Sequence, residues 1–437
     1  MDTIYAVASG LQRAGVSIIR VSGEAALLTY KNLTHRPVPV PRQAIFGSFR
    51  APETGKLLDK GMVLFFEKPN SFTGEDVIEY HVHGGTAVVR GFLDVLSRQP
   101  DCRLAAPGEF TRRAFENGKM DLTAAEAVAD LVDAETEAQR VQALDQLGGG
   151  LARLYEGWAE KLKKILAHQE AEIEFPEEDM PKQVSEKLRP EITTLIKEIR
   201  QHMDDGHRGE RLRNGVLIAI LGAPNAGKSS LLNALARRDV AIVSEEAGTT
   251  RDVIEAHLDL GGYPVILADT AGLRATESKV EAEGIRRARK LADESDIKVL
   301  LFDSTQAPDP ETIAMIDTST IVLMTKSDLP TAGAFAFQTA IKISAKTNDG
   351  IDALLKTLTE KVSTLFTPRN GPSLTRERHR LALDETIIAL ERSLAAILPE
   401  LAAEDLRLSL RSLGAITGTV HVEELLDRVF KDFCIGK

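Results

Sequence analysis

The stretch of sequence that decides the fold runs from Val216 to Ala236 and reads V-L-I-A-I-L-G-A-P-N-A-G-K-S-S-L-L-N-A-L-A. Its continuous apolar run predicts a buried strand over Val216–Leu221. Gly222–Ser229 then matches the phosphate-loop pattern G-x-x-x-x-G-K-[ST]. The leucine spacing that follows predicts a helix over Ser230–Ala236. A strand, this loop and a helix in that order are the structural context that the pattern requires, so the sequence predicts a nucleotide-binding α/β domain.

The predicted phosphate loop offers three kinds of contact to a nucleotide. Its glycines let main-chain amides close around phosphate, Lys228 brings a point charge to the outer phosphates, and Ser229 brings a hydroxyl to magnesium. The residues expected to contact the phosphates here are Asn225, Ala226, Gly227, Lys228, Ser229 and Ser230.

Four further motifs follow in chain order, and the last three each follow an apolar run that predicts a strand. The runs are Val265–Ala268, Ile321–Met324 and Ile341–Ile343, with a further strand predicted at Val299–Phe302. The motifs are Gly248-Thr249-Thr250-Arg251-Asp252, Asp269-Thr270-Ala271-Gly272, Thr325-Lys326-Ser327-Asp328 and Ser344-Ala345-Lys346. Thr250 and Asp269 are placed to serve magnesium, the latter through water. A carboxylate at Asp328 accepts both the N1 and the N2 hydrogens of guanine, so the predicted ligand is GTP and not ATP.

Two positions depart from the pattern usual in Ras-like GTPases. The guanine motif begins with Thr325, where Asn usually braces the base and the phosphate loop, so we expect weaker nucleotide affinity with guanine choice preserved. The position after D-T-A-G, where Gln orients the attacking water, is Leu273, which cannot bond water. Another group must then assist hydrolysis. The acidic candidates are Glu277, Glu281 and Glu283, and the arginine candidates are Arg251 and Arg274.

The composition excludes several classes of protein. Hydrophobic residues make up 43% and charged residues 27% of the chain, as in globular proteins, and no run approaches the roughly 20 apolar residues of a membrane span. With no secretory signal and only Cys102 and Cys434, we expect a cytoplasmic location. A net charge of −11 argues against a protein coated in nucleic acid. The basic clusters Arg286–Lys290 and Arg376–Arg380 are candidate contacts for a nucleic acid or a protein partner, with a solvated helix face as the alternative.

The texture of the sequence changes three times along its 437 residues, which predicts several domains. Mixed α/β texture covers 1–118, including strands at Val16–Val21 and Met62–Phe66. Long helices are predicted over 119–213, alternating strands and helices over 214–367, and helices again over 368–437. One helical texture on both sides of an α/β domain predicts a doubly wound domain inserted into an all-helical domain.

Several segments outside the nucleotide motifs carry a family resemblance. They are G-V-S-I-I-R-V-S-G (Gly15–Gly23), P-N-S-F-T-G-E-D-V-I-E (Pro69–Glu79), H-G-G (His83–Gly85), P-G-E-F-T-R-R-A-F-E-N-G-K-M-D-L (Pro107–Leu122), V-E-A-E-G-I (Val280–Ile285) and F-C-I-G-K (Phe433–Lys437). Together with the nucleotide motifs they resemble the MnmE (TrmE) family of tRNA uridine modification GTPases over essentially the whole chain. The resemblance implies a Ras-like G domain inserted into a split helical domain, after an α+β N-terminal domain that binds folate and mediates dimerisation.

The resemblance also implies how GTP is hydrolysed. G domains of the family pair across the nucleotide when potassium is bound, and the ion stands where an arginine finger would. Asn225 matches the potassium-binding Asn, and Ser244, Glu246 and Thr249 match the loop that wraps the ion. Glu281 matches the water-activating Glu, which selects one of the three acidic candidates. The expected GTP contacts in that loop are Ser244, Glu245, Glu246, Ala247, Gly248, Thr249 and Thr250.

A folate site and a set of partners follow from the same resemblance. The matching folate residues are Arg20, Glu79, Lys119 and Lys437, for a 5-formyl- or methylene-tetrahydrofolate, and Cys434 is a candidate for the one-carbon chemistry. The implied function is GTP-driven addition of a carboxymethylaminomethyl or aminomethyl group to C5 of the wobble uridine of tRNA. The implied partner is a FAD-dependent MnmG-type protein, bound to a homodimer as a heterotetramer. The alternatives are a ribosome-assembly GTPase switch and a GTP-regulated folate one-carbon transferase.

Overall fold

The computed structural model describes the chain except for 1, 11, 175–182, 239, 243–253, 270–285, 287–288, 332–336, 338, 367–370, 421–422, 432 and 437, and except for the side chains of 183–187, 254–255 and 424. It divides into two compact units. Unit 1 comprises Met1–Ala129, Gln146–Pro181 and Ile388–Lys437, and unit 2 comprises Asp130–Asp145 and Lys182–Ile387. Each unit is therefore assembled from segments that are distant in the sequence.

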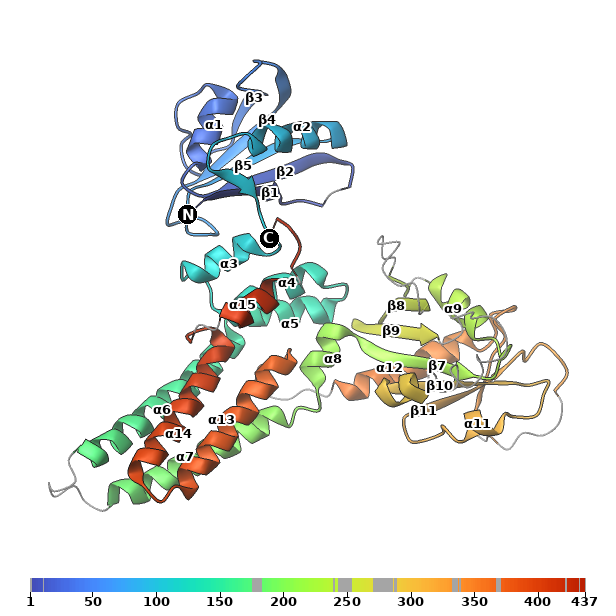
Figure 1. The fold of residues 1–437 in the computed structure, drawn as a ribbon. Helices are drawn as coiled ribbons and strands as arrows, with labels where there is room; N and C mark the ends of the chain where they lie inside the picture. The colour runs from blue at the N-terminus through green and yellow to red at the C-terminus, as the bar shows by residue number, and fades with distance from the viewer. Residues whose placement is uncertain are drawn as a thin grey trace. The chain divides into compact units, whose positions relative to one another are not determined.

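The N-terminal part of unit 1 is an α+β domain built on a six-stranded sheet (Figure 1). Its elements are β1 (Thr3–Val7), β2 (Ala14–Ser22), α1 (Ala26–Thr34), β3 (Ile45–Arg50), β4 (Leu57–Phe66), β5 (Val77–Gly84), α2 (Thr86–Ser97), β6 (Cys102–Leu104) and α3 (Glu109–Glu116). The strand order is β3-β4-β5-β2-β1-β6. Alternate residues of β2, β4 and β5 enter a core that includes Phe49, Tyr80 and Phe92, whose rings meet edge-on or tilted.

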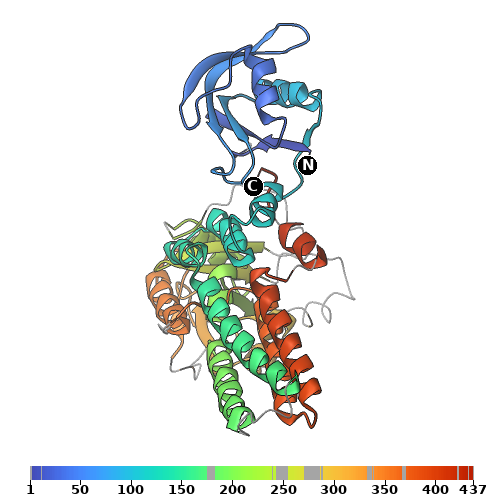
Figure 2. The same cartoon turned by 90° about the vertical axis from the view of Figure 1, so that its left-hand side faces the viewer.

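The remainder of unit 1 is helical, apart from a short tail. Its helices are α4 (Leu122–Asp133), which continues into unit 2, α6 (Gly150–Glu174), α14 (Pro399–Thr417) and α15 (Glu423–Lys431). The helices α6 and α14 lie side by side in both views (Figures 1 and 2), and Arg407 of α14 pairs with Glu170 of α6. After α15 the tail returns to the N-terminal domain, where Ile435 forms an antiparallel bridge with Pro107. Gly436 lies against the main-chain carbonyl of Val7.

Unit 2 contains the second six-stranded sheet and the helices that adjoin it in sequence. The adjoining helices are α5 (Glu137–Leu147), α7 (Gln183–Met203), α8 (Arg208–Asn214) and α13 (Glu377–Ala395), and α5 and α13 each continue into unit 1. The α/β elements are β7 (Val216–Gly222), α9 (Lys228–Ala236), β8 (Ile254–Leu260), β9 (Tyr263–Asp269), β10 (Ile297–Asp303), α11 (Pro310–Ile313), β11 (Thr320–Thr325), β12 (Ile341–Lys342) and α12 (Ile351–Leu365). The strand order is β12-β11-β10-β7-β9-β8, and all neighbouring pairs are parallel except β8 with β9.

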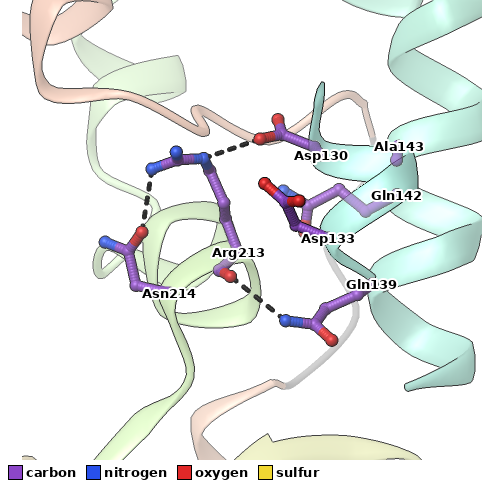
Figure 3. A pocket seen from close by; sticks show the side chains of 7 residues that line it. All are labelled: Asp130, Asp133, Gln139, Gln142, Ala143, Arg213 and Asn214. Atoms are coloured by element: carbon purple, nitrogen blue, oxygen red, sulfur yellow. Dashed lines mark hydrogen bonds and ion pairs between the residues drawn. The ribbon is translucent and has the colours of Figure 1, made fainter. Parts of the chain in front are cut away.

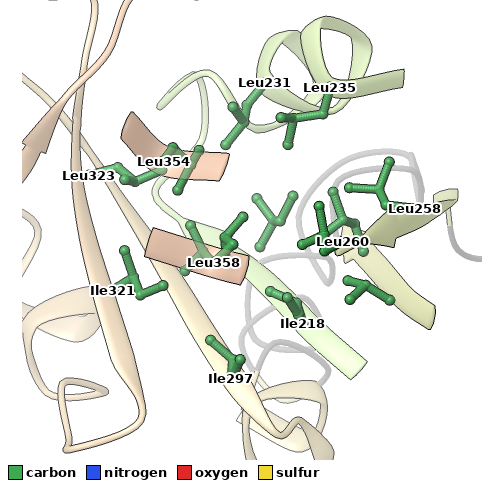
Figure 4. Packing of buried hydrophobic residues seen from close by; sticks show 14 of the residues in the cluster. Ile218, Leu231, Leu235, Leu258, Leu260, Ile297, Ile321, Leu323, Leu354 and Leu358 are labelled. Atoms are coloured by element: carbon green, nitrogen blue, oxygen red, sulfur yellow. The ribbon is translucent and has the colours of Figure 1, made fainter. Parts of the chain in front are cut away.

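This sheet is doubly wound around two apolar layers. In the larger layer, side chains of α9 and α12 pack on β7, β10 and β11 (Figure 4), with Ile218, Leu231 and Leu354 essentially inaccessible to solvent. The smaller layer includes Leu300, Phe302 and Met324. Because an apolar layer covers each face of the sheet, the parallel strands are continuous apolar runs, and such runs could be predicted from the sequence.

The architecture confirms the predicted fold class: an α+β N-terminal domain, then a Ras-like doubly wound domain between two helical stretches. In the second sheet, the strand over 254–260 was not predicted, β12 is one residue shorter than its predicted run, and the other strands extend beyond theirs by one to three residues. In the first sheet, β2 and β4 are three and five residues longer than predicted, and the remaining strands were not predicted. The sequence also predicts turns at Phe175-Pro176 and at Pro181 that interrupt the long helices, and both lie outside the described residues. Across the described part of the chain, no helix combines the length and apolarity that crossing a membrane requires.

Candidate functional site

The loop between β7 and α9 has the backbone of a phosphate loop. Gly222 and Gly227 have positive φ angles of 152° and 100°, and Asn225 adopts the left-handed conformation at φ 65°. A Cβ on Gly222 would lie 2.5 Å from the main-chain oxygen of Leu301, so no other residue fits there without displacing β10. No side chain caps the first turn of α9, which leaves its amides directed at the loop.

Lys228 is held inside this loop. Its Nζ donates hydrogen bonds to the main-chain oxygens of Gly222 at 2.7 Å and Ala223 at 3.0 Å. Burial lowers the pKa of the Lys228 ammonium, and the charge of Asp269 opposes that shift. A phosphate bound in the loop would provide the full negative charge that this buried cation lacks.

Ser229 and Asp269 form an oxygen pair suited to magnesium. Ser229 is the second residue of α9 and Asp269 the last residue of β9, and their Oγ and Oδ2 atoms lie 3.4 Å apart. Asp269 is fully buried at the carboxyl end of its strand. A hydroxyl beside a carboxylate is the kind of donor set that magnesium takes, with waters and phosphate oxygens completing the octahedron.

The guanine end of the site is assembled from β11 and from the loop after β12. The hydroxyl of Ser344 donates to Oδ1 of Asp328 at 2.8 Å, which fixes the carboxylate while leaving it exposed. Thr325 is buried, and its hydroxyl donates to the main-chain oxygen of Ala226 at 2.7 Å. The expected role of Asn in bracing the phosphate loop is therefore taken by a threonine hydroxyl.

Two residues at the end of β10 were missed by sequence reasoning. Asp303 accepts an ion-paired hydrogen bond from Nζ of Lys326 at 2.5 Å, and Ser304 donates to the main-chain oxygen of Lys326 at 3.1 Å. Lys326 has a positive φ of 56°, so this strand end holds the guanine motif in an uncommon backbone conformation. The sequence contained a signal for both residues, because polar residues that directly follow a buried parallel strand lie at the edge of the sheet where ligands bind.

Several predicted residues lie outside the described part of the chain. These are Ser244, Glu245, Glu246, Ala247, Gly248, Thr249, Thr250, Arg251, Thr270, Ala271, Gly272, Leu273, Arg274, Glu277, Glu281, Glu283 and Lys437. Their assignments stay predictions. Three further predicted contacts are neighbours in the sequence of residues described above: Ser230 follows Ser229, and Ala345 and Lys346 follow Ser344.

A second polar site lies on the sheet of the N-terminal domain. Arg20 of β2 and Glu79 of β5 are directly opposite in register, and Arg20 Nη2 lies 2.8 Å from Glu79 Oε1. The rings of Phe72 and Phe110 each lie 5.6 Å from the guanidinium carbon of Arg20. The guanidinium of Arg20 therefore lies beside two aromatic rings, and both members of the ion pair are largely shielded from water.

The other predicted members of this second site come from nearby segments. The side chain of Lys119 lies against Gly74, in the loop that carries Phe72. Cys434 is exposed, and its main-chain oxygen accepts from the amide of Gly108, two residues before Phe110. Phe72 and Phe110 were not predicted, although both stand in the quoted motifs P-N-S-F-T-G and P-G-E-F-T.

The basic cluster Arg376–Arg380 is largely engaged within the protein. Arg376 pairs with Asp130, and Arg380 pairs with Asp205 and Glu210. These ion pairs neutralise two of the positive charges that made the cluster a candidate for nucleic-acid binding. In the other cluster, 287 and 288 lie outside the described residues.

Comparison with known proteins gives matches over the whole chain. A family model for the MnmE helical domain matches 122–434, and one for the GTP-binding protein TrmE N-terminus matches 3–119. The chain is 51% identical over 441 residues to tRNA modification GTPase MnmE of Parvibaculum lavamentivorans and 52% identical over 441 residues to that of Paramagnetospirillum magneticum, with 100% of both chains covered in each case. It is 45% identical over 467 residues to 5-taurinomethyluridine-[tRNA] synthase subunit GTPB3, mitochondrial, of Danio rerio, covering 100% of this chain and 93% of that one.

Proposed function

Because this chain belongs to the MnmE (TrmE) family of tRNA modification GTPases, we propose that it hydrolyses GTP to drive modification of the wobble uridine of tRNA at C5. The observation that carries this proposal is the junction of the guanine motif with the phosphate loop. Thr325 bonds to Ala226 while Asp328, three residues later, is oriented by Ser344. Guanine recognition and phosphate binding are thus parts of one connected site.

In the bound state, each end of the nucleotide meets a different set of groups. The Asp328 carboxylate accepts from N1 and N2 of guanine, and the Ser344–Lys346 segment offers an amide to the guanine oxygen. The amides of α9 and the ammonium of Lys228 hold the phosphates. Ser229 and Thr250 would hold magnesium, with Asp269 acting through water, and the ion would neutralise phosphate charge.

Hydrolysis uses groups that replace the missing glutamine. We assign Glu281 to orient the attacking water, since Leu273 cannot do so. Asn225, together with the loop containing Ser244, Glu246 and Thr249, would hold potassium, which supplies positive charge beside the bond that breaks. Arg251 and Arg274 remain the candidates for an arginine contribution. The assignment of Asn225 to potassium is supported by its exposed position in the phosphate loop, next to the buried Ala226.

The N-terminal site is proposed to bind a tetrahydrofolate. A pterin is flat and has an amide-like edge, which suits the carboxylate of Glu79 and the aromatic rings of Phe72 and Phe110 that lie beside its partner Arg20. Lys119 and Lys437 would hold the carboxylates of its glutamate tail. A 5-formyl- or methylene-tetrahydrofolate would supply the one-carbon unit, with Cys434 nearby in the tail.

The proposed assembly is a homodimer that binds a FAD-dependent MnmG-type partner as a heterotetramer in the cytoplasm. The N-terminal sheet supports pairing, because Phe46 and Met62 are opposite each other on neighbouring strands and are 67% and 44% exposed. The flavin is assigned to the partner since no G-x-G-x-x-G fingerprint follows the first strand of this chain.

The test is the mass of the wobble nucleoside in tRNA from a strain that lacks this protein. We expect loss of a carboxymethylaminomethyl or aminomethyl group from C5, restored by the wild-type gene. Unchanged tRNA would reject the proposal in favour of a ribosome-assembly switch or a folate one-carbon transferase. In parallel, GTP turnover by the pure protein should be faster in potassium than in sodium salts.

A further inference from the structure

Both ends of the inserted domain are bonded to one carboxylate. The chain enters the α/β domain through α8 and returns through 371–376 to α13. Oδ1 of Asp130, on the last turn of α4, accepts from Nε of Arg213 at 2.8 Å and from Nη2 of Arg376 at 2.8 Å. Figure 3 shows the Arg213 guanidinium directed at Asp130. The Asp130 side chain is only 12% exposed, so this shared contact is screened little by solvent.

The incoming and returning segments also contact each other. Arg208 donates to the hydroxyl of Ser373 at 2.6 Å. A Cβ on Gly209 would lie 2.1 Å from the main-chain oxygen of Leu374, so the two backbones approach as closely as glycine allows. The two segments are therefore joined directly, and both also contact the carboxylate of Asp130.

The helix α5 joins this arrangement to the strands that lead to the nucleotide. Gln139 and Gln142 donate to the main-chain oxygens of Arg213 at 3.1 Å and Gly209 at 3.0 Å. At the start of the same helix, the amide of Ala138 donates to the oxygen of Gly262, in the turn between β8 and β9. The hairpin β8–β9 begins after the predicted loop around the ion and ends at Asp269, so α5 is hydrogen-bonded to the turn of the hairpin that leads to the nucleotide site.

Beside this network the structure leaves room for movement. A cavity of about 140 Å³ is lined by Asp130, Asp133, Gln139, Gln142, Ala143, Arg213 and Asn214 (Figure 3). Within the described part of the chain, Oε1 of Gln142 is buried with no hydrogen-bond partner. The polar groups around Arg213 thus have an alternative acceptor within the same cavity, so they can rearrange without packing against an apolar wall.

From these contacts we propose that Asp130 is a positioning residue that couples the GTP cycle to tRNA modification by holding the incoming and returning segments of the G domain together. The inference rests on the proposed function for its readout in tRNA. Asp130 touches neither nucleotide nor tRNA in this scheme. In this proposal, a change in the position of the β8–β9 hairpin alters the contacts of Asp130 and so changes the positions of α4 and α5.

The test compares Asp130→Asn with wild type and with Glu137→Gln. Glu137 pairs with Arg140 on the exposed face of α5, so its loss removes an ion pair that does not involve the incoming or returning segments. For Asp130→Asn we expect GTP turnover within about twofold of wild type and a fall of about tenfold in tRNA modification by the complete assembly. Glu137→Gln should change neither rate. Asp130→Glu, which keeps the carboxylate, should recover modification.

A second readout is independent of tRNA. Amide hydrogen exchange is measured with GDP and with a non-hydrolysable GTP analogue, and the difference between the two states is compared by segment. In wild type we expect this difference both in the phosphate loop and over α4–α5. In Asp130→Asn it should persist in the phosphate loop and disappear from α4–α5.

The possible results distinguish a coupling role of Asp130 from a general effect on activity. Equal losses of GTP turnover and modification, or no loss of either, would overturn the coupling role. An unaltered exchange pattern in α4–α5 would overturn it too, even if wild type itself failed to modify tRNA and so contradicted the proposed function. If Asp130→Asn unfolds, Arg213→Gln removes the contact of the incoming segment with Asp130 and must reproduce the expected pattern.

Discussion

The side-chain hydroxyl of Thr325 donates to the main-chain oxygen of Ala226 at 2.7 Å and approaches that of Phe302 at 3.3 Å. One buried hydroxyl therefore connects the guanine motif, the phosphate loop and the neighbouring strand. The sequence suggested a weakened site at this position because an amide was missing. The geometry shows that the phosphate-loop part of the bracing is retained.

The first prediction concerns this hydroxyl. Thr325→Val keeps the shape of the side chain and removes the donor, which leaves a buried carbonyl unsatisfied at a cost of about 1–3 kcal/mol. We expect affinity for GDP and GTP to fall about tenfold, because a loosened loop binds phosphate less well. Titration with a fluorescent guanine nucleotide measures this change.

A matched control is Thr386→Val, since that buried hydroxyl donates to the main-chain oxygen of Ala382 in α13. It should lower stability without changing nucleotide affinity. Equal affinities for Thr325→Val and wild type would show that the hydroxyl does not brace the loop.

Asp328→Asn should alter base preference. An amide offers a donor where the carboxylate only accepts, so it complements the 2-oxo group of xanthine in place of the 2-amino group of guanine. We expect XTP to become the preferred substrate in competition assays. Ser344→Ala, which removes the donor that orients Asp328, should weaken guanine binding without changing the preference. Continued preference for GTP in Asp328→Asn would place guanine recognition elsewhere.

Glu79→Gln should weaken binding at the N-terminal site. The substitution keeps the size of the side chain and removes its charge, so it removes the ion pair with Arg20 and weakens the proposed pairing with a pterin edge. Calorimetric titration with 5-formyl-tetrahydrofolate should show at least about a tenfold loss of affinity, with GTP turnover retained. Glu53→Gln is the control, because Glu53 pairs with Arg98 at an exposed position of the same domain.

His202 predicts a dependence of stability on pH. Its pKa in the folded protein is lowered to about 4, mainly by burial, with the charge of Asp205 opposing the shift and those of Arg380 and His379 adding to it. Between about pH 4 and pH 6.5 the unfolded chain binds the extra proton, so stability falls as the pH falls through this window, by up to about 3 kcal/mol. Urea unfolding at pH 7 and pH 5 measures the difference.

His202→Gln should flatten that profile, whereas His168→Gln, at an exposed position on α6, should leave it unchanged. A profile for His202→Gln with the wild-type slope would assign the pH dependence to other groups.

The sequence predicted most of the doubly wound sheet because β7, β10 and β11 are buried on both faces and read as unbroken apolar runs. The strand β8 was missed because it is an edge strand in which apolar and polar residues alternate, as in I-E-A-H-L-D-L, so no apolar run marks it. Motif spacing likewise predicts a phosphate contact at Lys228 and a guanine contact at Asp328, and the structure places both residues shortly after strands of this sheet.

Other parts of the sites depend on contacts that no local pattern contains. The two arginines on Asp130 come from positions 83 and 246 residues away. The rings beside Arg20 belong to two separate segments of the sequence. From the sequence alone, each of these residues could be interpreted only as a surface charge or as part of a hydrophobic core.

The antiparallel bridge between Pro107 and Ile435 has a consequence for biosynthesis, because it joins positions more than three hundred residues apart. At a translation rate of about 5–20 residues per second, roughly 16–65 s pass between the emergence of one partner and that of the other. Throughout that interval the nascent N-terminal sheet lacks the segment that later lies along Val7. The ribosome therefore completes this region only after it has made the GTP-binding part, and a prematurely terminated polypeptide never acquires it.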